Sequence, residues 1–365
     1  MTAALTETAL MQALQTVVDP NTGRDVVASR AIGQLRIDGA DVSMQLTLGY
    51  PGRSQHAALR RALVAAARGV PGVGNVSVEI VTRIVSHAVQ RGVQLLPGVK
   101  NVIAVASGKG GVGKSTTTVN LALALAAEGA SVGILDADIY GPSQPMMMGI
   151  SGRPESIDGT TMEPLENYGV QVMSIGFLID EDQAMISRGP MATQALDQLL
   201  RQTRWRELDY LLVDMPPGTG DIALTLSQRV PLTGAVIVTT PQDIALLDAK
   251  KGLKMFEKVG VPILGIVENM AVYHCPACGH VEHIFGADGG RRMAADYGID
   301  YLGGLPLTLS IRESADGGRP SVVADPEGDI AATYKAVARQ VAVKIALKAK
   351  DFSAKFPTIT VSKGT

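Results

Sequence analysis

The stretch Gly108-Lys-Gly-Gly-Val-Gly-Lys-Ser-Thr-Thr117 decides the fold of this chain. It contains the pattern Gly-x-x-x-x-Gly-Lys-Ser, which ends at Lys114 and Ser115. The apolar run of residues 102–106 precedes it and predicts a buried strand, and the Leu- and Ala-rich residues 120–127 predict a helix after it. A strand, a glycine-rich loop and a helix in this order are typical of a P-loop, which binds nucleotide phosphates.

Each residue type in this loop has a role in holding phosphate. Glycine lets backbone N–H groups turn toward phosphate oxygens, and the following helix adds its positive end. We expect Lys114 to reach the β- and γ-phosphates and the Ser115 hydroxyl to ligate Mg²⁺. The alternative is a chance match in a chain with 40 glycines. The predicted ATP-binding residues of the loop are Gly108, Lys109, Gly110, Gly111, Val112, Gly113, Lys114, Ser115 and Thr116.

Acidic residues follow two other predicted strands. The apolar residues 210–213 end in Asp214, which is the Walker B pattern of the carboxylate that holds Mg²⁺ in P-loop NTPases. Asp136 and Asp138 follow the predicted strand 132–135, at the strand end where α/β proteins bind ligands. Asp136 is interpreted either as a turn or helix cap or as a direct Mg²⁺ ligand.

Short apolar runs alternate with helical stretches from residue 101 onward, which predicts a parallel sheet with helices on both faces. The predicted fold class is therefore α/β, a doubly wound and mostly parallel P-loop ATPase domain over residues 101–350. A small α+β domain precedes it. The expected strands cover residues 102–106, 132–135, 170–175, 210–213, 235–239, 263–267 and 301–305.

A closing helix is expected from residue 329 to about 350. Its apolar residues recur at helical spacing, and its end is rich in lysine. The stripe either packs on the sheet, where lysines near the helix C-terminus suit the dipole, or binds a membrane surface. The stripe consists of Ile330, Tyr334, Val337, Val341 and Ile345.

Residues 1–92 have the pattern of the small α+β domain. A helix is expected over residues 7–17 and ends at the turn cluster Val-Asp-Pro-Asn-Thr-Gly of residues 18–23. Alternating residues predict strands at 41–48 and 76–82, with a helix at 55–68 between them. Residues 93–100 are predicted to be a linker, and residues 351–365 a tail that is disordered after Pro357.

Composition excludes several classes of protein. The net charge of −2 gives no general attraction to nucleic acid or to an anionic membrane. Residues 1–14 have no basic cluster, so they do not resemble a secretory signal, and no apolar run reaches the roughly 18 residues of a spanning helix. We expect a soluble, cytoplasmic protein that binds neither nucleic acid nor membrane.

The only cysteines, Cys275 and Cys278, are two residues apart and fit three kinds of site. One is a dithiol redox site, although Gly279 disfavours the helix that such sites begin. Another is a zinc site within one chain, with His280 and His283, although these follow too soon for a zinc finger. The third is a [4Fe–4S] cluster, which commonly takes four thiolates and would be shared between two chains related by a two-fold axis.

The loop with its second lysine resembles the deviant P-loop of the ParA/MinD-like ATPases. This resemblance implies that Lys109 reaches the nucleotide of a partner subunit in a sandwich dimer, as an arginine finger does in trans; a solvated loop lysine is the alternative. It also implies that Asp138 lies near the attacking water. Lys109, Lys114 and Asp138 are therefore the expected catalytic residues. Asn269 is expected to bind the purine, or else to cap a loop.

Further motifs resemble the Mrp/ApbC iron–sulfur cluster carriers. They are Asp-x-Pro-Pro-Gly-Thr-Gly-Asp at residues 214–221 and Cys-Pro-x-Cys-Gly after the strand end at Asn269 and Met270. Residues 1–92 resemble the small domain fused to many of these proteins, which also occurs alone in SufT-like assembly factors. Arg188-Gly-Pro-Met191 matches as well and receives no role.

This second resemblance implies a homodimer that binds a labile [4Fe–4S] cluster between subunits through Cys275 and Cys278. Such a carrier takes the cluster from scaffold proteins, delivers it to apo-proteins and hydrolyses ATP slowly. The implied cofactors are ATP, Mg²⁺ and the cluster. The alternatives are a ParA/MinD-type partitioning ATPase and a regulatory ATPase with a structural zinc ion at the Cys-x-x-Cys segment.

Overall fold

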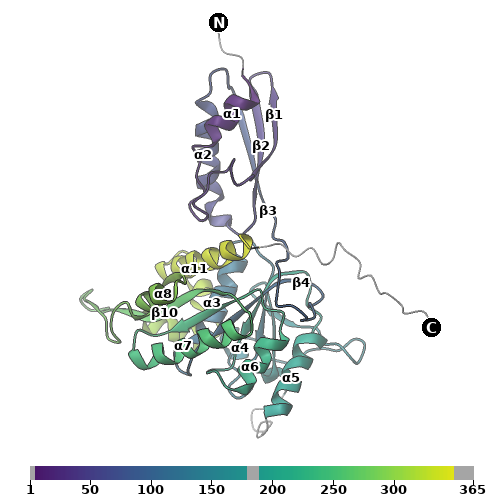
Figure 1. The fold of residues 1–365 in the computed structure, drawn as a ribbon, viewed down its shortest axis with the longest axis vertical. Helices are drawn as coiled ribbons and strands as arrows, with labels where there is room; N and C mark the ends of the chain where they lie inside the picture. The colour runs from purple at the N-terminus through teal and green to yellow at the C-terminus, as the bar shows by residue number, and fades with distance from the viewer. Residues whose placement is uncertain (1–4, 179–188, 349–365) are drawn as a thin grey trace, which may run out of the picture.

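The computed structural model describes residues 5–178 and 189–348, so Arg188 and the predicted tail lie outside the described residues. A three-stranded sheet with its helices is followed by a nine-stranded sheet covered by helices (Figure 1). The predicted fold class, a doubly wound α/β domain after a small α+β domain, is confirmed.

The small sheet is built around the alternating strand that the sequence predicts. Every second residue of β2 (Asp41–Leu48) is buried, so one face of the strand is apolar and packs inward. The strand β3 (Val76–Thr82) pairs parallel with β2, and both strands have their predicted bounds. Helices α1 (Glu7–Leu14) and α2 (His56–Arg68) pack together beside this sheet, and a short 3₁₀ helix, η1 (Arg53–Gln55), leads into α2.

The sequence prediction misses the third strand of the small sheet. The strand β1 (Ile32–Asp38) pairs antiparallel with β2, but its register shifts between Gly33 and Arg36, and Gln34 has a positive φ of 50°. A bulge of this kind breaks the alternation that marks a strand in a sequence. The helix α1 also ends earlier than the predicted residue 17.

The strand order of the large sheet is β11-β10-β9-β4-β8-β5-β7-β6, with β12 also paired to β10. Its pairings are parallel except β10–β11 and β6–β7. All the strands predicted from apolar runs are present, whereas β6 and β11 are not predicted and β10 runs well past its predicted end at residue 267. The strands are β4 (Val99–Ala106), β5 (Val132–Asp136), β6 (Leu165–Asn167), β7 (Val170–Ser174), β8 (Leu208–Asp214), β9 (Gly234–Thr239), β10 (Ile263–His274), β11 (Val281–Glu282) and β12 (Tyr301–Leu307).

Helices lie on both faces of this sheet because the chain winds in two directions from β4. Strand β5 lies on one side of β4, and β9 and β10 lie on the other, so right-handed crossovers place α3 and α7 on opposite faces. The helices and 3₁₀ turn of this part are α3 (Lys114–Ala127), α4 (Gln144–Met147), η2 (Ile175–Phe177), α5 (Gly189–Gln202), α6 (Asp221–Arg229), α7 (Asp243–Lys258), α8 (Gly289–Tyr297), α9 (Leu309–Asp316), α10 (Ser321–Ala324) and α11 (Asp329–Ala346).

The apolar stripe of α11 packs inside the protein. Tyr334, Val337, Val341 and Ile345 are all buried, and α11 lies against α3 and β12. The packing interpretation of the stripe is therefore correct. Among the helices of residues 5–178 and 189–348, none is long and apolar enough to cross a membrane.

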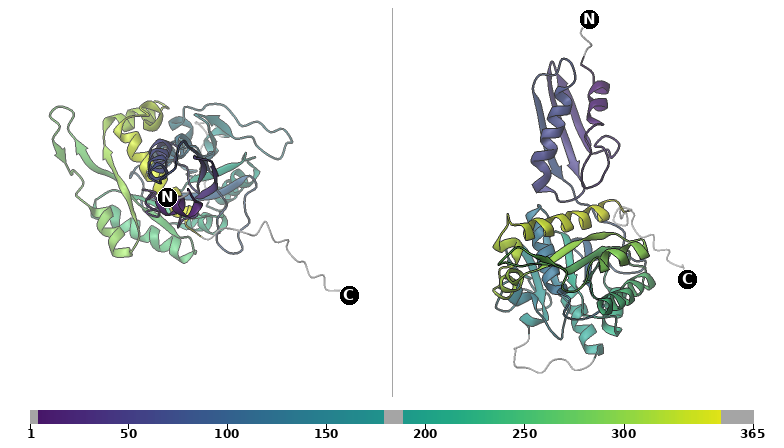
Figure 2. Two further views of the ribbon diagram at one scale, coloured as in Figure 1. Left: turned by 90° about the horizontal axis from the view of Figure 1, so that it is seen from above. Right: turned by 90° about the vertical axis from the view of Figure 1, so that its left-hand side faces the viewer.

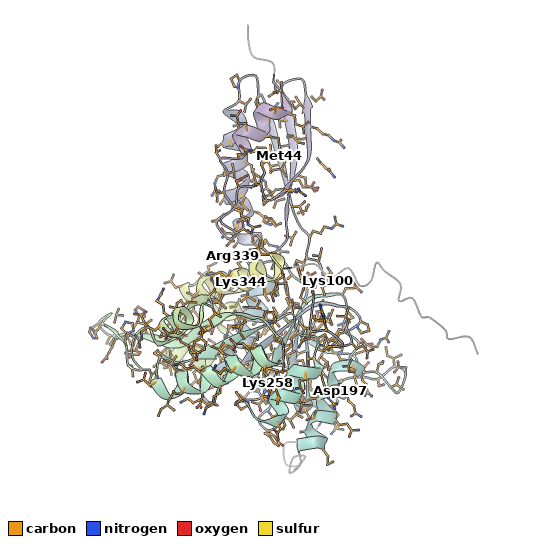
Figure 3. All side chains as sticks on the ribbon, in the orientation of Figure 1. Met44, Lys100, Asp197, Lys258, Arg339 and Lys344 are labelled. Atoms are coloured by element: carbon orange, nitrogen blue, oxygen red, sulfur yellow. The ribbon has the colours of Figure 1, made fainter. Side chains whose placement is uncertain are left out.

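Helix α11 lies between the two parts of the chain, directly under the small sheet (Figure 2). Arg339 on this helix faces the small domain (Figure 3) and donates 2.6 Å and 3.1 Å hydrogen bonds to Glu128 Oε1 and Ser54 Oγ. Glu128, at the end of α3, also accepts hydrogen bonds from the backbone N–H and the hydroxyl of Ser54. The end of the P-loop helix is thus bonded directly to the turn that begins α2.

The predicted turn cluster of the small domain contributes Asp19 and Thr22 to the wall of a cavity. Asp19 is buried and accepts hydrogen bonds from Asn21 N–H, the Thr22 hydroxyl and the Tyr50 hydroxyl. Asp19, Thr22 and Tyr50 line a cavity of about 830 Å³ that also reaches Leu347 beyond the end of α11. The predicted turn cluster is therefore a hydrogen-bonded structural turn at the junction with the large domain.

Candidate functional site

The P-loop leaves β4 at its carboxyl end and enters α3. Gly111 and Gly113 have φ values of 79° and 83°, a conformation that residues with a Cβ rarely adopt. Gly108 is required for a different reason, because a Cβ there would overlap the backbone of Asp248 on α7. The loop thus has the backbone conformation in which N–H groups can turn toward a phosphate group. It is also packed tightly against α7.

Lys114 lies at the centre of the site. Its side chain is only 6% exposed, and its Nζ lies 2.6 Å from Oδ1 of the fully buried Asp214. The same nitrogen lies 3.1 Å from the Ser115 hydroxyl and 3.9 Å from Asp138 Oδ2. Four predicted residues from three separate stretches of sequence therefore meet around one ammonium group.

Neutral donors that the sequence does not predict surround Asp214. The Thr118 hydroxyl donates a 3.1 Å hydrogen bond to Asp214 Oδ1, and the Gln144 amide donates a 2.9 Å hydrogen bond to Oδ2. Gln144 Nε2 also donates to the backbone oxygen of Ser115. Gln144 therefore joins the P-loop helix, the Walker B strand and the loop after β5.

Asp136 organises the loop that carries Asp138. It is fully buried and accepts hydrogen bonds from the backbone N–H groups of Asp138, Ser143 and Gln144. Burial, together with the nearby Asp214 carboxylate, raises the pKa of Asp136 to about 7. A carboxylate that accepts hydrogen bonds from backbone N–H groups in this way acts as a turn or helix cap, which is one of the two interpretations of Asp136 from the sequence.

Asp138 and Lys109 are the partly exposed charged residues of the site. Burial is the main cause that raises the pKa of Asp138, and the neighbouring Lys114 opposes it. Lys109 is partly exposed, and within residues 5–178 and 189–348 its ammonium group has no ion-pair partner. The expected roles of Asp138 at the attacking water and of Lys109 across a dimer stay predictions.

The Walker B loop also borders the P-loop. The N–H of Gly218 donates a 3.0 Å hydrogen bond to the Ser107 carbonyl, and Met215 N–H donates one of the same length to Val105. The loop then enters α6 at Asp221. A change at the phosphate site would therefore reach this loop through backbone contacts.

Asn269 contacts the P-loop from β10. Its side-chain Nδ2 donates a 2.9 Å hydrogen bond to the Val112 carbonyl, and the residue is 8% exposed. A Cβ on Gly113 would overlap this nitrogen, so the fit is tight. The structure shows the loop-capping role, and the purine contact stays a prediction.

The two cysteines lie in a hairpin that continues β10. Strands β10 and β11 pair through Tyr273–Glu282 and His274–Val281, and Cys275 and Cys278 lie in the turn between them. The hairpin projects from the large domain (Figures 1 and 2). Hydrogen bonds from the Ala277 and Cys278 N–H groups, followed by one from the Cys278 side chain, lower the pKa of the Cys275 thiol. Two thiols are therefore presented to the solvent.

The nearby histidines do not complete a metal site with these thiols. His283 Nδ1 lies 2.8 Å from the backbone oxygen of Ala271 at the base of the hairpin. In the part of the chain that the structure describes, no three His, Cys, Asp or Glu side chains lie close enough together to hold a metal ion. One chain alone therefore offers the thiol pair, without the Cys₂His₂ arrangement.

Two family models match this chain. One, described as NUBPL iron-transfer P-loop NTPase, matches residues 98–342, and the other, described as iron-sulfur cluster assembly protein, matches residues 7–79. The chain belongs to the NUBPL iron-transfer P-loop NTPase family. The predicted resemblance to the ParA/MinD-like ATPases and the Mrp/ApbC carriers is confirmed.

Relatives of this NUBPL-family chain resemble it over most of their length. The iron-sulfur cluster carrier protein of Haemophilus influenzae is 47% identical over 337 residues, which cover 92% of this chain and 91% of that protein. The iron-sulfur cluster carrier protein of Pseudomonas fragi is 58% identical over 269 residues, or 73% of this chain and 94% of that protein.

Solved structures resemble the large domain of this NUBPL-family chain. The nucleotide-binding protein of Archaeoglobus fulgidus in complex with ADP has 40% sequence identity and a TM-score of 0.56, covering 64% of this chain and 90% of that one. The cell division ATPase MinD of Pyrococcus furiosus shares the fold, with a TM-score of 0.51 at 22% identity over 66% of this chain and 98% of that one.

Proposed function

We propose that this protein is an ATP-dependent carrier of iron–sulfur clusters that acts as a homodimer. It would hold a labile [4Fe–4S] cluster between two subunits, pass the cluster to apo-proteins and hydrolyse ATP slowly to ADP and phosphate. The observation that carries the proposal is the thiol pair at the tip of a hairpin whose first strand also contacts the P-loop. The names of the relatives, iron-sulfur cluster carrier protein, support it.

The ligand count favours two chains. Cys275 and Cys278 supply two thiolates, whereas a [4Fe–4S] cluster commonly takes four. A second copy related by a two-fold axis supplies the same pair from the opposite side. The exposed hairpin leaves the thiols accessible to that copy, to a scaffold protein that loads the cluster and to the apo-protein that receives it.

The phosphate site supplies the chemistry of hydrolysis. Lys114 would exchange its contact with Asp214 for the β- and γ-phosphates, and the N–H groups of residues 108–116 would bind the phosphate oxygens. Asp138 would orient the attacking water, and Lys109 would reach the nucleotide of the other subunit. The Ser115 hydroxyl and the Asp214 carboxylate fit Mg²⁺, which neutralises charge on the phosphates when it is bound.

The small domain would serve as a docking module for protein partners. Its hydrogen bonds through Ser54 to Glu128 and Arg339 fix it on the face of the large domain that carries α11. We place the domains at residues 1–92 and 101–350, with the join at 93–100, of which β4 takes the last two residues. The cluster would be held on a different edge of the large domain, so docking and holding use separate surfaces.

Anaerobic reconstitution tests the proposal. The purified protein is incubated with iron, sulfide and a thiol reductant, and its absorbance, iron and zinc contents and mass are then measured. We expect broad absorbance near roughly 400 nm and about four iron atoms per dimer, because four thiolates hold one [4Fe–4S] cluster. Loaded protein should then activate an apo-enzyme that requires the cluster. A monomer with one stable zinc ion that iron does not replace would contradict the proposal.

A further inference from the structure

Strand β10 joins the phosphate site to the thiol hairpin without interruption. Residues 263–268 pair with β9 and residues 266–273 pair with β12, so residues 266–268 are paired on both sides and the pairing with β9 ends at Glu268. The strand continues to His274, and Cys275 follows directly. Asn269 lies at the boundary between the doubly paired part and the extension, about 17 Å along the strand from the hairpin turn at a rise of ~3.3 Å per residue.

Asn269 contacts the P-loop backbone directly, so a movement of that backbone would change its contacts. Its side chain bonds to the Val112 carbonyl, and it fills the space where a side chain on Gly113 would lie. Both P-loop residues precede Lys114, whose ammonium group bonds to Asp214 in this structure and must turn toward phosphate when nucleotide binds. A shift of the Val112–Gly113 backbone would therefore be passed to Asn269.

The next residue carries backbone strain. Met270 has a φ of 57°, which is uncommon for a residue with a side chain and is found where the surroundings hold it in place. The pairing of β10 with β12 is irregular at this point, since it steps from Glu268–Gly304 to Val272–Pro306. Four residues of β10 are thus set against two of β12, which is a bulge.

Strand β10 is held more firmly before this bulge than after it, because beyond Glu268 it has lost the pairing with β9, and Val272 and Tyr273 pair with β12. Glu268 is buried, and its Oε2 accepts a 2.7 Å hydrogen bond from the N–H of Gly290 at the start of α8. Beyond Met270 the strand becomes half-buried and then exposed at His274. A rearrangement at residues 269 and 270 would therefore act on the hairpin and its pairing with the end of β12, while residues 263–268 keep their pairing with β9.

We propose that Asn269 and Met270 are positioning residues that link nucleotide binding at the P-loop to the orientation of Cys275 and Cys278. Without nucleotide, the Asn269–Val112 hydrogen bond holds Met270 at positive φ. With nucleotide, that bond changes, Met270 relaxes toward extended backbone and the hairpin turns. The use of this link in cluster transfer rests on the proposed function, whereas the link itself does not.

The test measures the thiols without iron. Metal-free, reduced full-length protein is reacted with a fluorescent maleimide, with and without MgADP, and the rates at Cys275 and Cys278 are determined by mass spectrometry. We expect MgADP to change the rate at least about fivefold, which is the lower end of typical coupling between sites. Analytical ultracentrifugation in both conditions shows whether dimer formation contributes.

Three variants separate a link from a merely structural contact. Asn269→Ala loses the bond to Val112 and should react, without nucleotide, at the rate of nucleotide-bound wild type. Met270→Val should do the same, because a β-branched residue disfavours positive φ. Met270→Gly accepts that φ freely and should keep the nucleotide-free rate of wild type. Met11→Val, on α1 of the small domain, controls for the Met-to-Val change.

The outcomes are distinct. The link is overturned if MgADP leaves the wild-type rate unchanged, or if Asn269→Ala still shows the full response while a fluorescent ADP analogue binds it normally. It is also overturned if Met270→Val and Met270→Gly behave alike at the same melting temperature. If MgADP changes the labelling rate of the thiols but the protein never holds a cluster, the link stands and the proposed function is refuted.

Discussion

The Arg339 guanidinium lies 2.6 Å from the Glu128 carboxylate at the junction of the two domains, and the two side chains are 14% and 1% exposed. Glu128 ends the helix that begins at Lys114, and Arg339 lies on α11. The pair therefore joins the far end of the P-loop helix to the closing helix, and Ser54 adds the small domain to the same carboxylate.

Removing this pair should destabilise the protein. Glu128→Ala leaves the Arg339 guanidinium largely buried without its carboxylate, so the free energy of unfolding should fall by about 3 kcal/mol. Urea unfolding measures the change. Glu166→Ala is the matched control, because Glu166 pairs with Arg206 at 3.0 Å on the exposed surface and should contribute less than about 1 kcal/mol. If both substitutions lower the free energy of unfolding equally, the junction pair contributes no more to stability than an exposed ion pair.

Lys114→Ala should nearly abolish ATP hydrolysis. The phosphate charge loses its partner, and the loss of one well-placed group of this kind typically costs about 10²–10³-fold in rate. Steady-state phosphate release measures it, with Lys251→Ala as the control, since Lys251 is exposed and its ion pair with Asp248 at 2.9 Å lies on the surface of α7. Cluster loading should survive in Lys114→Ala because both thiols remain. Near-normal turnover would refute the P-loop role of this lysine.

Lys109→Ala should bind nucleotide almost normally but hydrolyse it more slowly, by up to about 10³-fold if it acts as a trans finger. Mixing Lys109→Ala with Asp138→Ala tests the trans role. In a mixed dimer one of the two sites receives an intact Asp138 from one chain and an intact Lys109 from the other. Activity should therefore return after subunit exchange. No recovery in a mixture with demonstrated exchange would place Lys109 in cis or outside catalysis.

Cys275→Ala and Cys278→Ala should each lose the absorbance near roughly 400 nm, because the cluster then has too few thiolates. ATP hydrolysis should persist in both variants. His280→Ala and His283→Ala are the controls and should keep the cluster, since His283 bonds to the Ala271 carbonyl and His280 is exposed. In a zinc site the same histidine substitutions would release metal and destabilise the fold, so metal content and melting temperature distinguish the two sites.

Lys348 should make stability depend on pH. Burial lowers its pKa from 10.5 to about 8, and its Nζ donates a 2.8 Å hydrogen bond to the Thr233 carbonyl. Between these two pH values the unfolded chain holds a proton that the folded chain has released, so the free energy of unfolding should rise with pH across that window. Lys348→Met should lack this rise, and Lys258→Met, at the exposed end of α7, should retain it. Identical pH profiles for Lys348→Met and wild type would contradict the shift.

The sequence predicts the central strands well because parallel strands buried on both faces read as continuous apolar runs. It predicts Lys114 and Asp214 as site residues, but their hydrogen bond across 100 positions depends on the order of β4 and β8. Gln144 is missed because a neutral amide on a short helix carries no motif. The extension of β10 is missed because its bulge at Met270 breaks the strand pattern.

Gly108 lies so close to Asp248 on α7 that a Cβ would overlap the backbone of that residue. The glycines at 108 and 113 are required by neighbours on α7 and β10, whether or not a phosphate is ever bound. A descendant of this chain that lost the ability to split ATP would still unfold or distort if either glycine changed. The glycine pattern alone therefore indicates how the loop is packed. The charged residues Lys114, Asp138 and Asp214 are the ones that indicate ATP hydrolysis.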